Sequence, residues 1–344
     1  MLYPIKFKPR IKERIWGGQA ILKKKGSAAS RLAKHKLYGE SWDLSSVKGD
    51  ISVVANGMLK GNNLNEIIEV YMGELIGEEN FERYGEEFPL LIKYLDCNDK
   101  LSVQVNPDDE LAMERHDSFG KTEAWYVVDC KPGAAIYLGF KDLNITREEY
   151  IAAVAESRLE PLLNRVEVHP SDVFFIPAGT IHAIGGGVLI YEIQQNSTLT
   201  YRLYDYKRVD KNGCQRPLHI EKAMKVSQLQ PYTPYDFDGQ ESEKKYISAT
   251  GRCDGVTLGK CKYFHTQLFS IPADDTRLFS VNEESYLAIT VVDGNGWLTY
   301  TDDNGDISYV NLTRGKSYFF PAGSGDFTLE GGDMTVITVE TPGE

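Results

Sequence analysis

Four side chains carry the residue types that metal-assisted chemistry needs. Gln104, Glu123 and His182 offer an amide oxygen, a carboxylate and an imidazole nitrogen, and each lies in or next to a different predicted strand. Arg202 lies on a fourth predicted strand. Three protein ligands beside one open position are typical of a catalytic zinc site. If the fold brings these strands together, the four residues form a metal site beside a permanently charged guanidinium.

Each of these residues also has a purely structural interpretation. A lone histidine such as His182 is more often a hydrogen-bonded core residue than a ligand. The strand at residues 101–106 alternates apolar and polar side chains, and its polar row either lines a cavity or faces solvent. Glu123 shares a face with Trp125 in a largely apolar strand. A carboxylate in that position is costly to bury unless it is paired or binds a metal.

An internal repeat favours a functional role for the histidine. Residues 172–182 contain an apolar strand, a Pro-Ala-Gly turn and then His182. Residues 317–326 repeat the strand and the turn, and Asp326 stands where the histidine would be. The repeat suggests two copies of one β unit. Because the second copy keeps the turn without the histidine, the fold alone does not require it, and the chemistry belongs to the first copy.

The elements around these residues predict a mainly β protein. Short apolar strands joined by glycine-rich turns are typical of an antiparallel barrel or a double sheet. Asn63 is a predicted cap for a helix at residues 64–76, and Thr146 with Glu149 forms a capping box for a helix that reaches about residue 163. A shorter amphipathic helix is predicted from Pro217 to Val226. Further strands are predicted at residues 173–176, 188–194, 199–206, 263–271, 286–292, 296–301, 308–312 and 335–339.

The length of 344 residues predicts two domains. Residues 228–245 are polar, acidic and dotted with Pro and Gly, so the boundary is expected there. We expect a catalytic domain at residues 1–230, with helical insertions at about 63–77 and 146–163. We expect a second β domain without metal ligands at residues 231–344.

Composition limits the class of partner. The net charge of −12 argues against non-specific nucleic-acid binding, which needs a basic surface. No apolar run approaches the ~20 residues that a membrane span requires, and the first residues have no apolar signal segment. Five scattered cysteines are typical of a reduced, cytoplasmic protein. We expect a monomer or a homodimer that acts on a small molecule.

Five motifs, in order, resemble those of type I mannose-6-phosphate isomerase in its shorter bacterial form. The resemblance runs from about Pro4 to the end of the chain, and all of its specific motifs precede residue 206. The motifs are GESWDLS at residues 39–45, LSVQVNPDD at 101–109, GKTEAWY at 120–126, PAGTIHA at 177–183 and QQNSTLTYR at 194–202.

The resemblance implies a fold, a cofactor and a reaction. The fold would be two cupin (jelly-roll) β-barrel units with a few helices inserted in the N-terminal part. The enzyme would bind one zinc ion per chain and interconvert mannose 6-phosphate and fructose 6-phosphate. Matched motif by motif, Glu123 and His182 resemble zinc ligands, Gln104 a ligand or its neighbour, and Arg202 the catalytic arginine.

One position departs from the family pattern. The family has a zinc-binding histidine where this chain has Asn106. An amide oxygen is a weaker and harder donor than imidazole. The full set of metal ligands is then Gln104, Asn106, Glu123 and His182, and we expect weaker zinc binding, a different divalent ion or lost activity. His116, in the segment that follows, is a candidate substitute, although a loop histidine is more often simply exposed.

The implied reaction assigns roles to further residues. Aldose–ketose isomerisation through a cis-enediol develops negative charge on the sugar oxygens, which a divalent ion stabilises. Arg202 and Lys121 are the catalytic candidates. Ser102 and Lys93 join them as candidates for substrate binding, although Lys93 fits a solvated surface lysine better. The alternatives are a non-catalytic sugar-phosphate-binding cupin and, less consistent with this ligand set, another cupin enzyme such as a metal oxygenase.

Overall fold

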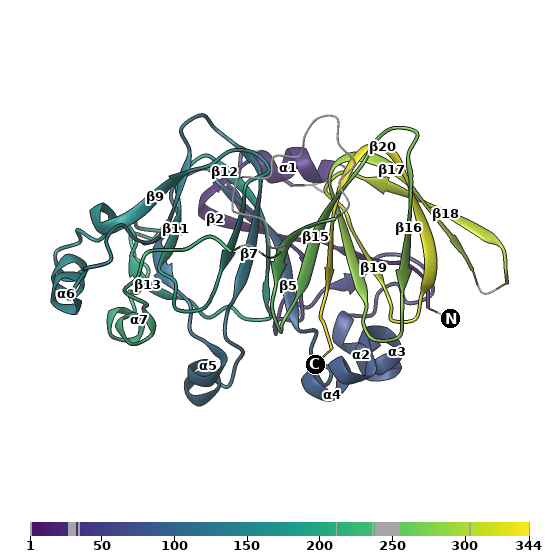
Figure 1. Ribbon diagram of the computed structural model, residues 1–344, viewed down its shortest axis with the longest axis horizontal. Coiled ribbons are helices and arrows are strands. Elements are labelled where there is room, and N and C mark those ends of the chain that lie inside the picture. Colours follow the sequence, from purple (N-terminus) through teal and green to yellow (C-terminus); the bar gives the residue numbers. More distant parts are fainter. Residues whose placement is uncertain are drawn as a thin grey trace.

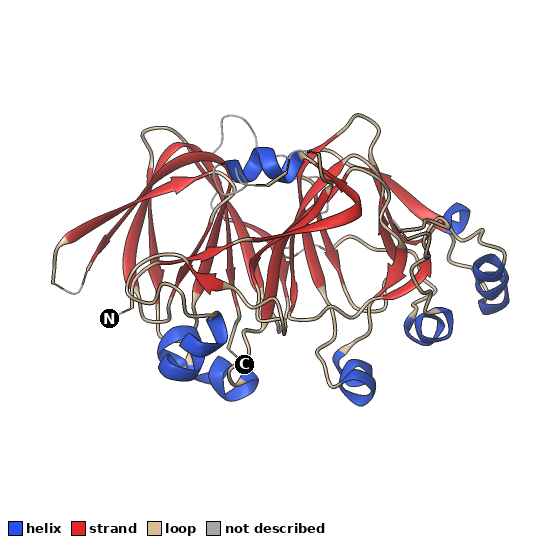
Figure 2. Cartoon of the chain, turned by 180° about the vertical axis from the view of Figure 1, so that it is seen from behind, coloured by secondary structure: helices blue, strands red, loops and turns tan. Residues whose placement is uncertain are grey.

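The computed structural model describes residues 2–26, 32–33, 35–210, 212–235, 237, 255–302 and 304–343. Two β lobes lie side by side, and Figure 1 shows most of the helices along one rim. Figure 2 shows that strands make up the bulk of both lobes and that one helix lies on the opposite rim. The predicted mainly β fold is confirmed. The described strands form open sheets rather than closed barrels.

Two facing sheets build the first lobe. Apolar side chains of both sheets, among them Trp125, Leu138 and Ile190, form one buried cluster between them. The six-stranded sheet runs β10 (Val173–Ile176), β7 (Glu123–Cys130), β12 (Val188–Gln195), β5 (Leu90–Cys97), β3 (Tyr38–Leu44) and β2 (Arg10–Gly18). The five-stranded sheet runs β13 (Tyr201–Tyr204), β6 (Val103–Val105), β11 (His182–Ile184), β8 (Ala135–Phe140) and β9 (Leu163–Glu167).

A nine-stranded sheet builds the second lobe. Two of its strands, β1 and β4, come from the start of the chain, and β1 pairs with both β19 and β4. The proposed division at residue 230 stays a prediction, and residues 238–245 of its linker lie outside the described residues. The strands are β14 (Val256–Lys260), β15 (His265–Ile271), β20 (Gly325–Glu340), β17 (Leu287–Thr301), β19 (Ser317–Phe320), β1 (Ile5–Lys8), β4 (Val53–Val54), β16 (Thr276–Val281) and β18 (Ile307–Thr313).

Two of the three predicted helix starts are confirmed, but all three helices are shorter than expected, and the third begins at Ile220 rather than at Pro217. Asn63 and Thr146 each form a capping box. The first helix breaks at Met72, whose φ of 48° is left-handed and cannot continue an α-helix. The helices are α1 (Ala20–Lys25), α2 (Leu64–Tyr71), α3 (Gly73–Ile76), α4 (Glu78–Tyr84), α5 (Asp109–His116), α6 (Arg147–Ala155), the 3₁₀ turn η2 (Glu160–Leu162) and α7 (Ile220–Val226).

The two copies of the Pro-Ala-Gly turn have the same geometry. In the first copy, the amide of Thr180 donates to the carbonyl of Pro177 at 3.2 Å. In the second, the amide of Ser324 donates to the carbonyl of Pro321, also at 3.2 Å. Each turn follows a buried strand, β10 or β19, and its glycine has a positive φ. The repeat therefore extends from sequence to local structure.

Candidate active site

Three of the predicted site residues form a row across neighbouring strands. In the five-stranded sheet, Gln104 on β6 is directly opposite His182 on β11 and Arg202 on β13. Residues opposite each other in adjacent strands point to the same face of a sheet. The alternation in residues 101–106 therefore places Gln104 on the inner face, where His182 and Arg202 join it.

Glu123 approaches this row from the opposing six-stranded sheet. Its Oε2 atom lies 4.0 Å from Nε2 of His182, and both side chains are almost completely buried. Three donors already contact the Glu123 carboxylate. Trp125 Nε1 donates to Oε2 at 2.9 Å, while Asn106 Nδ2 at 2.7 Å and the Lys121 ammonium both reach Oε1. The cost of burying this carboxylate is thus offset by an ion pair and two neutral hydrogen bonds.

Asn106 lies in the same cluster. Besides donating to Glu123, its Oδ1 accepts a hydrogen bond from the Thr200 hydroxyl at 3.1 Å. His116 does not replace it, because His116 Nε2 contacts the hydroxyl of Tyr201 at 2.9 Å. Tyr201 precedes Arg202 on β13, so the two side chains point to opposite faces of the sheet. His116 therefore lies on the far side of the sheet from the cluster.

Local hydrogen bonds orient the histidine and the glutamine. His182 Nδ1 lies 2.9 Å from the carbonyl of Thr180, which can only accept, so Nδ1 carries the proton. The other ring nitrogen, Nε2, then keeps its lone pair and accepts from Gln104 Nε2 at 3.1 Å. Ser102 Oγ in turn donates to Gln104 Oε1 at 3.2 Å. The polar row of residues 101–106 is buried, so the solvent-facing alternative for it is wrong.

The protonation states suit a cation site. Burial alone would raise the pKa of Glu123, but the charge of Lys121 and the nearby His182 lower it to about 2. Burial lowers the pKa of His182, and Glu123 only partly opposes this effect. At neutral pH the site therefore holds an ionised carboxylate and a neutral imidazole, the forms in which both groups bind metal.

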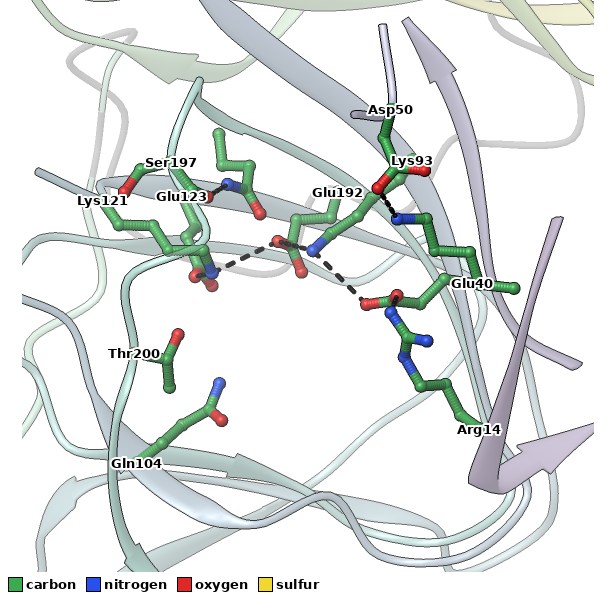
Figure 3. Close-up of polar contacts among 12 residues, drawn as sticks. Arg14, Glu40, Asp50, Lys93, Gln104, Lys121, Glu123, Glu192, Ser197 and Thr200 are labelled. Carbon is green, nitrogen blue, oxygen red and sulfur yellow. Dashed lines mark hydrogen bonds and ion pairs between the residues drawn. The ribbon is translucent and has the colours of Figure 1, made fainter. Parts of the chain in front are cut away.

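Glu123 is also the inner end of a row of alternating charges, which we call the charge ladder: Arg14, Glu40, Lys93, Glu192, Lys121 and Glu123 (Figure 3). Lys93 Nζ lies 3.2 Å from Glu192 Oε1, and Lys121 Nζ lies 3.6 Å from the same oxygen. The ladder leads from Arg14, whose side chain is 36% exposed, to the buried Glu123. The expectation that Lys93 is a solvated surface lysine is wrong, because Lys93 is buried within the ladder.

Glu192 and Glu40 belong to the charge ladder but were not predicted from the sequence. A signal for Glu192 was present, because a single acidic residue interrupts the apolar strand β12. Its opposite neighbour on β5 is Lys93, the single basic residue of that strand. Isolated opposite charges in two buried strands indicate a cross-strand ion pair. Choosing this pairing required the strand register, which the sequence does not show.

Arg202 keeps part of its guanidinium unpaired. Its Nη1 donates to the carbonyl of Pro217 at 2.9 Å, whereas its Nε is buried and has no hydrogen-bond partner among the described residues. Burial and the positive charge of Arg216 lower the pKa of Arg202. Burying a guanidinium nitrogen without a partner costs free energy, so an acceptor that reached this nitrogen would be bound favourably.

The donor set fits a divalent cation, though not in the usual zinc pattern. Within the described residues, no group of three or more His, Cys, Asp or Glu side chains is arranged to hold a metal. The cluster instead supplies one imidazole (His182), one carboxylate (Glu123) and two amides (Gln104 and Asn106). Three oxygen donors to one nitrogen favour a harder ion than a histidine-rich set does. Lys121 also competes for the carboxylate.

Comparison with known proteins gives the family. A sequence model of the family described as phosphomannose isomerase type I, catalytic domain, matches residues 5–143. Mannose-6-phosphate isomerase ManA of Bacillus subtilis is 36% identical over 329 residues, which make up 95% of this chain and 96% of ManA. The chain belongs to the type I phosphomannose isomerase family.

Solved structures agree with this family. The crystal structure of the mannose 6-phosphate isomerase from Bacillus subtilis matches with a TM-score of 0.82 and 34% identity, covering 98% of this chain and 99% of that one. A putative mannosephosphate isomerase from Archaeoglobus fulgidus matches with a TM-score of 0.75 over 98% of both chains, but at 23% identity it shows the fold alone. The family thus extends over both lobes, beyond the 139 residues of the catalytic-domain match.

Proposed function

We propose that this chain is an aldose–ketose isomerase that interconverts mannose 6-phosphate and fructose 6-phosphate. The main support is its similarity to a mannose-6-phosphate isomerase along nearly the full length of both chains. The convergence of Gln104, Glu123 and His182 beside Arg202 is consistent with this function. Family membership and site chemistry thus point to the same reaction.

We further propose that Gln104, Glu123 and His182 hold one divalent ion, with Asn106 as a fourth, weaker donor. Zinc is the expected ion, and the oxygen-rich set makes its affinity low. When bound, such an ion would stabilise negative charge on the sugar oxygens. The Lys121 ammonium contacts Oε1 of Glu123 whereas Oε2 faces His182, so the ion and the ammonium would share this carboxylate.

The protein groups have distinct proposed tasks. Arg202 offers its Nε, unpartnered among the described residues, to the enediolate or to the phosphate group. Lys121 lies between Glu123 and Glu192, close enough to the cluster to exchange a proton with a sugar oxygen. Lys93 is held by Glu192 and Glu40, so it fits a positioning role better than direct phosphate binding. Ser102 fixes the Gln104 amide rather than reaching substrate directly.

Cellular context follows from the proposed substrate. Phosphorylated sugars are expected in the cytoplasm, where the four described cysteines, none of them in a disulfide, would stay reduced. Among the described residues, no helix is long and apolar enough to cross a membrane. A monomer or a homodimer stays our expectation for the assembly.

A direct assay separates this function from its alternative, a sugar-phosphate-binding protein without catalysis. Purified protein is treated with a chelator, supplied with zinc, manganese or no metal, and incubated with mannose 6-phosphate. Nuclear magnetic resonance then follows the appearance of fructose 6-phosphate. We expect conversion that depends on added metal, and no conversion of unphosphorylated mannose. Binding of mannose 6-phosphate without conversion under every metal condition would instead support the non-catalytic alternative.

A further inference from the structure

A second concave site lies between the two lobes. It is a pocket of about 280 Å³ between the end of α1 and the turns around β17, β18 and β19. Figure 1 shows α1 on the rim opposite most of the helices. We call it the lysine pocket, and the lining side chains that matter here are Lys23, Lys24, Asn295, Thr313, Arg314 and Lys316.

The lysine pocket concentrates positive charge in an acidic protein. Its lining includes no acidic side chain, whereas the whole chain carries a net charge of −12. Lys24 and Arg314 share one nearby carboxylate, Asp293, at 3.8 and 3.5 Å. Lys23 and Lys316 have no ion pair among the described residues. Like charges that outnumber their counter-charges repel one another, so an anion in the pocket would relieve that repulsion.

The electrostatics of neighbouring groups agree with this crowding. Burial lowers the pKa of Lys24, and the charge of Arg314 adds to the effect against the opposing pull of Asp293. Burial also lowers the pKa of Lys6, and the charge of Lys316 lowers it further. Each lysine therefore shows the effect of another cation close by.

The walls of the lysine pocket are fixed by close packing. Lys25, next to Lys24, is buried with its ammonium on Asp43 of β3 and donates to the carbonyl of Gly315 at 2.7 Å. Gly315 has a φ of 77°, and a Cβ atom there would lie 2.3 Å from the carbonyl oxygen of Lys24. Only glycine fits this approach. The backbone segments that carry Lys24 and Arg314 are thus fixed by close packing.

We propose that the lysine pocket binds a compact phosphorylated anion. Its volume of about 280 Å³ is just below the usual range for small-molecule sites, about 300–1,000 Å³, which suits a phosphate or diphosphate group better than a large ligand. Ammonium and guanidinium groups are the usual partners of phosphate oxygens. The side chains of Asn295 and Thr313 add neutral polar groups. The pocket is lined by none of the candidate active-site residues, so this is a separate site.

The test compares variants of the full chain. In the pocket variant, Lys23→Gln is combined with Lys316→Gln. In the control variant, Lys48→Gln is combined with Lys260→Gln, which removes the same charge from exposed positions elsewhere. Calorimetric titration at low salt uses inorganic phosphate, pyrophosphate and mannose 6-phosphate as separate probes. An Arg202→Ala background reduces binding of these probes at the candidate active site.

We expect pyrophosphate to bind the Arg202→Ala protein and the control variant with affinities within twofold of each other. We expect the pocket variant to bind at least tenfold more weakly. The strongest probe identifies whether the site prefers an inorganic anion or a sugar phosphate. No measurable binding of any probe at millimolar concentration, or equal binding by the pocket variant, would overturn the proposal. If the pocket variant fails to fold, Arg314→Gln provides the same comparison at an exposed position.

Discussion

The ionised state of Glu123 depends on three neighbouring hydrogen-bond donors. Its carboxylate is buried yet accepts from Lys121, Asn106 and Trp125. Only an ionised carboxylate can satisfy all three donors at once, which is why its pKa falls despite burial. The same three contacts limit how strongly Glu123 can bind a metal, because a ligand shared with an ammonium donates less charge.

The Asn106→His substitution should strengthen zinc binding by at least tenfold. It would replace an amide oxygen with an imidazole nitrogen and remove a hydrogen-bond donor from Glu123. Competition with a chromophoric chelator measures the zinc affinity of both proteins. Unchanged affinity would show that residue 106 does not face the metal. Asn106→Gln, which keeps the amide, is the matched control and should not tighten zinc binding.

Arg202→Ala should reduce kcat at least a hundredfold while leaving the metal content unchanged. Arg202 lies opposite Gln104 in the same row of strand residues as His182, and its guanidinium cannot donate an electron pair to a cation. Removing a donor that stabilises developing negative charge typically lowers kcat by a factor on the order of 10²–10³. Elemental analysis with steady-state kinetics measures both properties. Near-normal turnover would remove Arg202 from the mechanism.

Ionised Glu123 should contribute to stability above pH 4.5 and lose this contribution as the pH falls. Its pKa is about 2 in the folded chain and 4.5 in an unperturbed glutamate, so as the pH falls protons bind the unfolded chain first. A shift of this size corresponds to about 3 kcal/mol. Urea unfolding of wild type and Glu123→Gln at pH 6 and pH 3 measures it. The stability difference between them should shrink at pH 3, and a constant difference would contradict the shift.

At the scale of elements, the segment that carries Lys121 is held from three directions. The amide of Thr122 donates to Gln195 Oε1 at 2.9 Å, and Gln195 Nε2 donates to Asp109 Oδ1 at 2.8 Å. The amide of Gly120 also donates to Asp109. Tyr263, from the second lobe, donates its hydroxyl to the other oxygen of Asp109. The second lobe thereby helps to position Lys121 without lining the site.

Tyr263→Phe should lower kcat several-fold with little change in KM. It removes one hydrogen bond to Asp109 and should cost about 1 kcal/mol of stability. Steady-state kinetics and thermal unfolding measure the two effects separately. Tyr232→Phe is the control, since its hydroxyl donates to the carbonyl of Phe175 away from this segment. A fall in Tm with kcat unchanged would give Tyr263 a structural role only.

The elements show which features a sequence can predict. Local patterns predicted the starts of β10 and β12, both capping boxes and the polar row of β6, because alternation and caps depend on near neighbours. The predicted starts of β13, β15 and β20 were wrong. Local patterns also failed for β17, expected as two strands. There Gly294 and two register shifts make bulges within one continuous strand. The partners of Lys93 and Glu192 depended on pairing between distant strands and could not be predicted locally.

At the scale of the whole molecule, a buried polar network joins the lobes. Lys25 pairs with Asp43 of the first lobe and donates to Gly315 of the second. Asp43 also accepts from Ser317 at 3.1 Å and from Ser41 at 2.9 Å. Together with the pairing of β1 to β19, these bonds make unfolding of one lobe costly for the other.

Lys25→Met should destabilise the protein by about 3 kcal/mol, because it leaves the buried Asp43 without its counter-ion. The double substitution Lys25→Met with Asp43→Leu should recover part of this loss, since it removes the unpaired charge. Urea unfolding of the two variants measures both effects. A single variant within 0.5 kcal/mol of wild type, or a double variant no more stable than the single one, would contradict the account.

The most direct test measures isomerase turnover in wild type, in Glu123→Gln and in a surface control, Lys48→Gln, with the metal supplied in excess. Glu123 is the residue on which cation binding and the charge ladder both depend. We predict that wild type and the control convert mannose 6-phosphate to fructose 6-phosphate at equal rates, and that the rate of Glu123→Gln is at least a hundredfold lower. Equal turnover in all three proteins, or none in wild type, would contradict the proposed site.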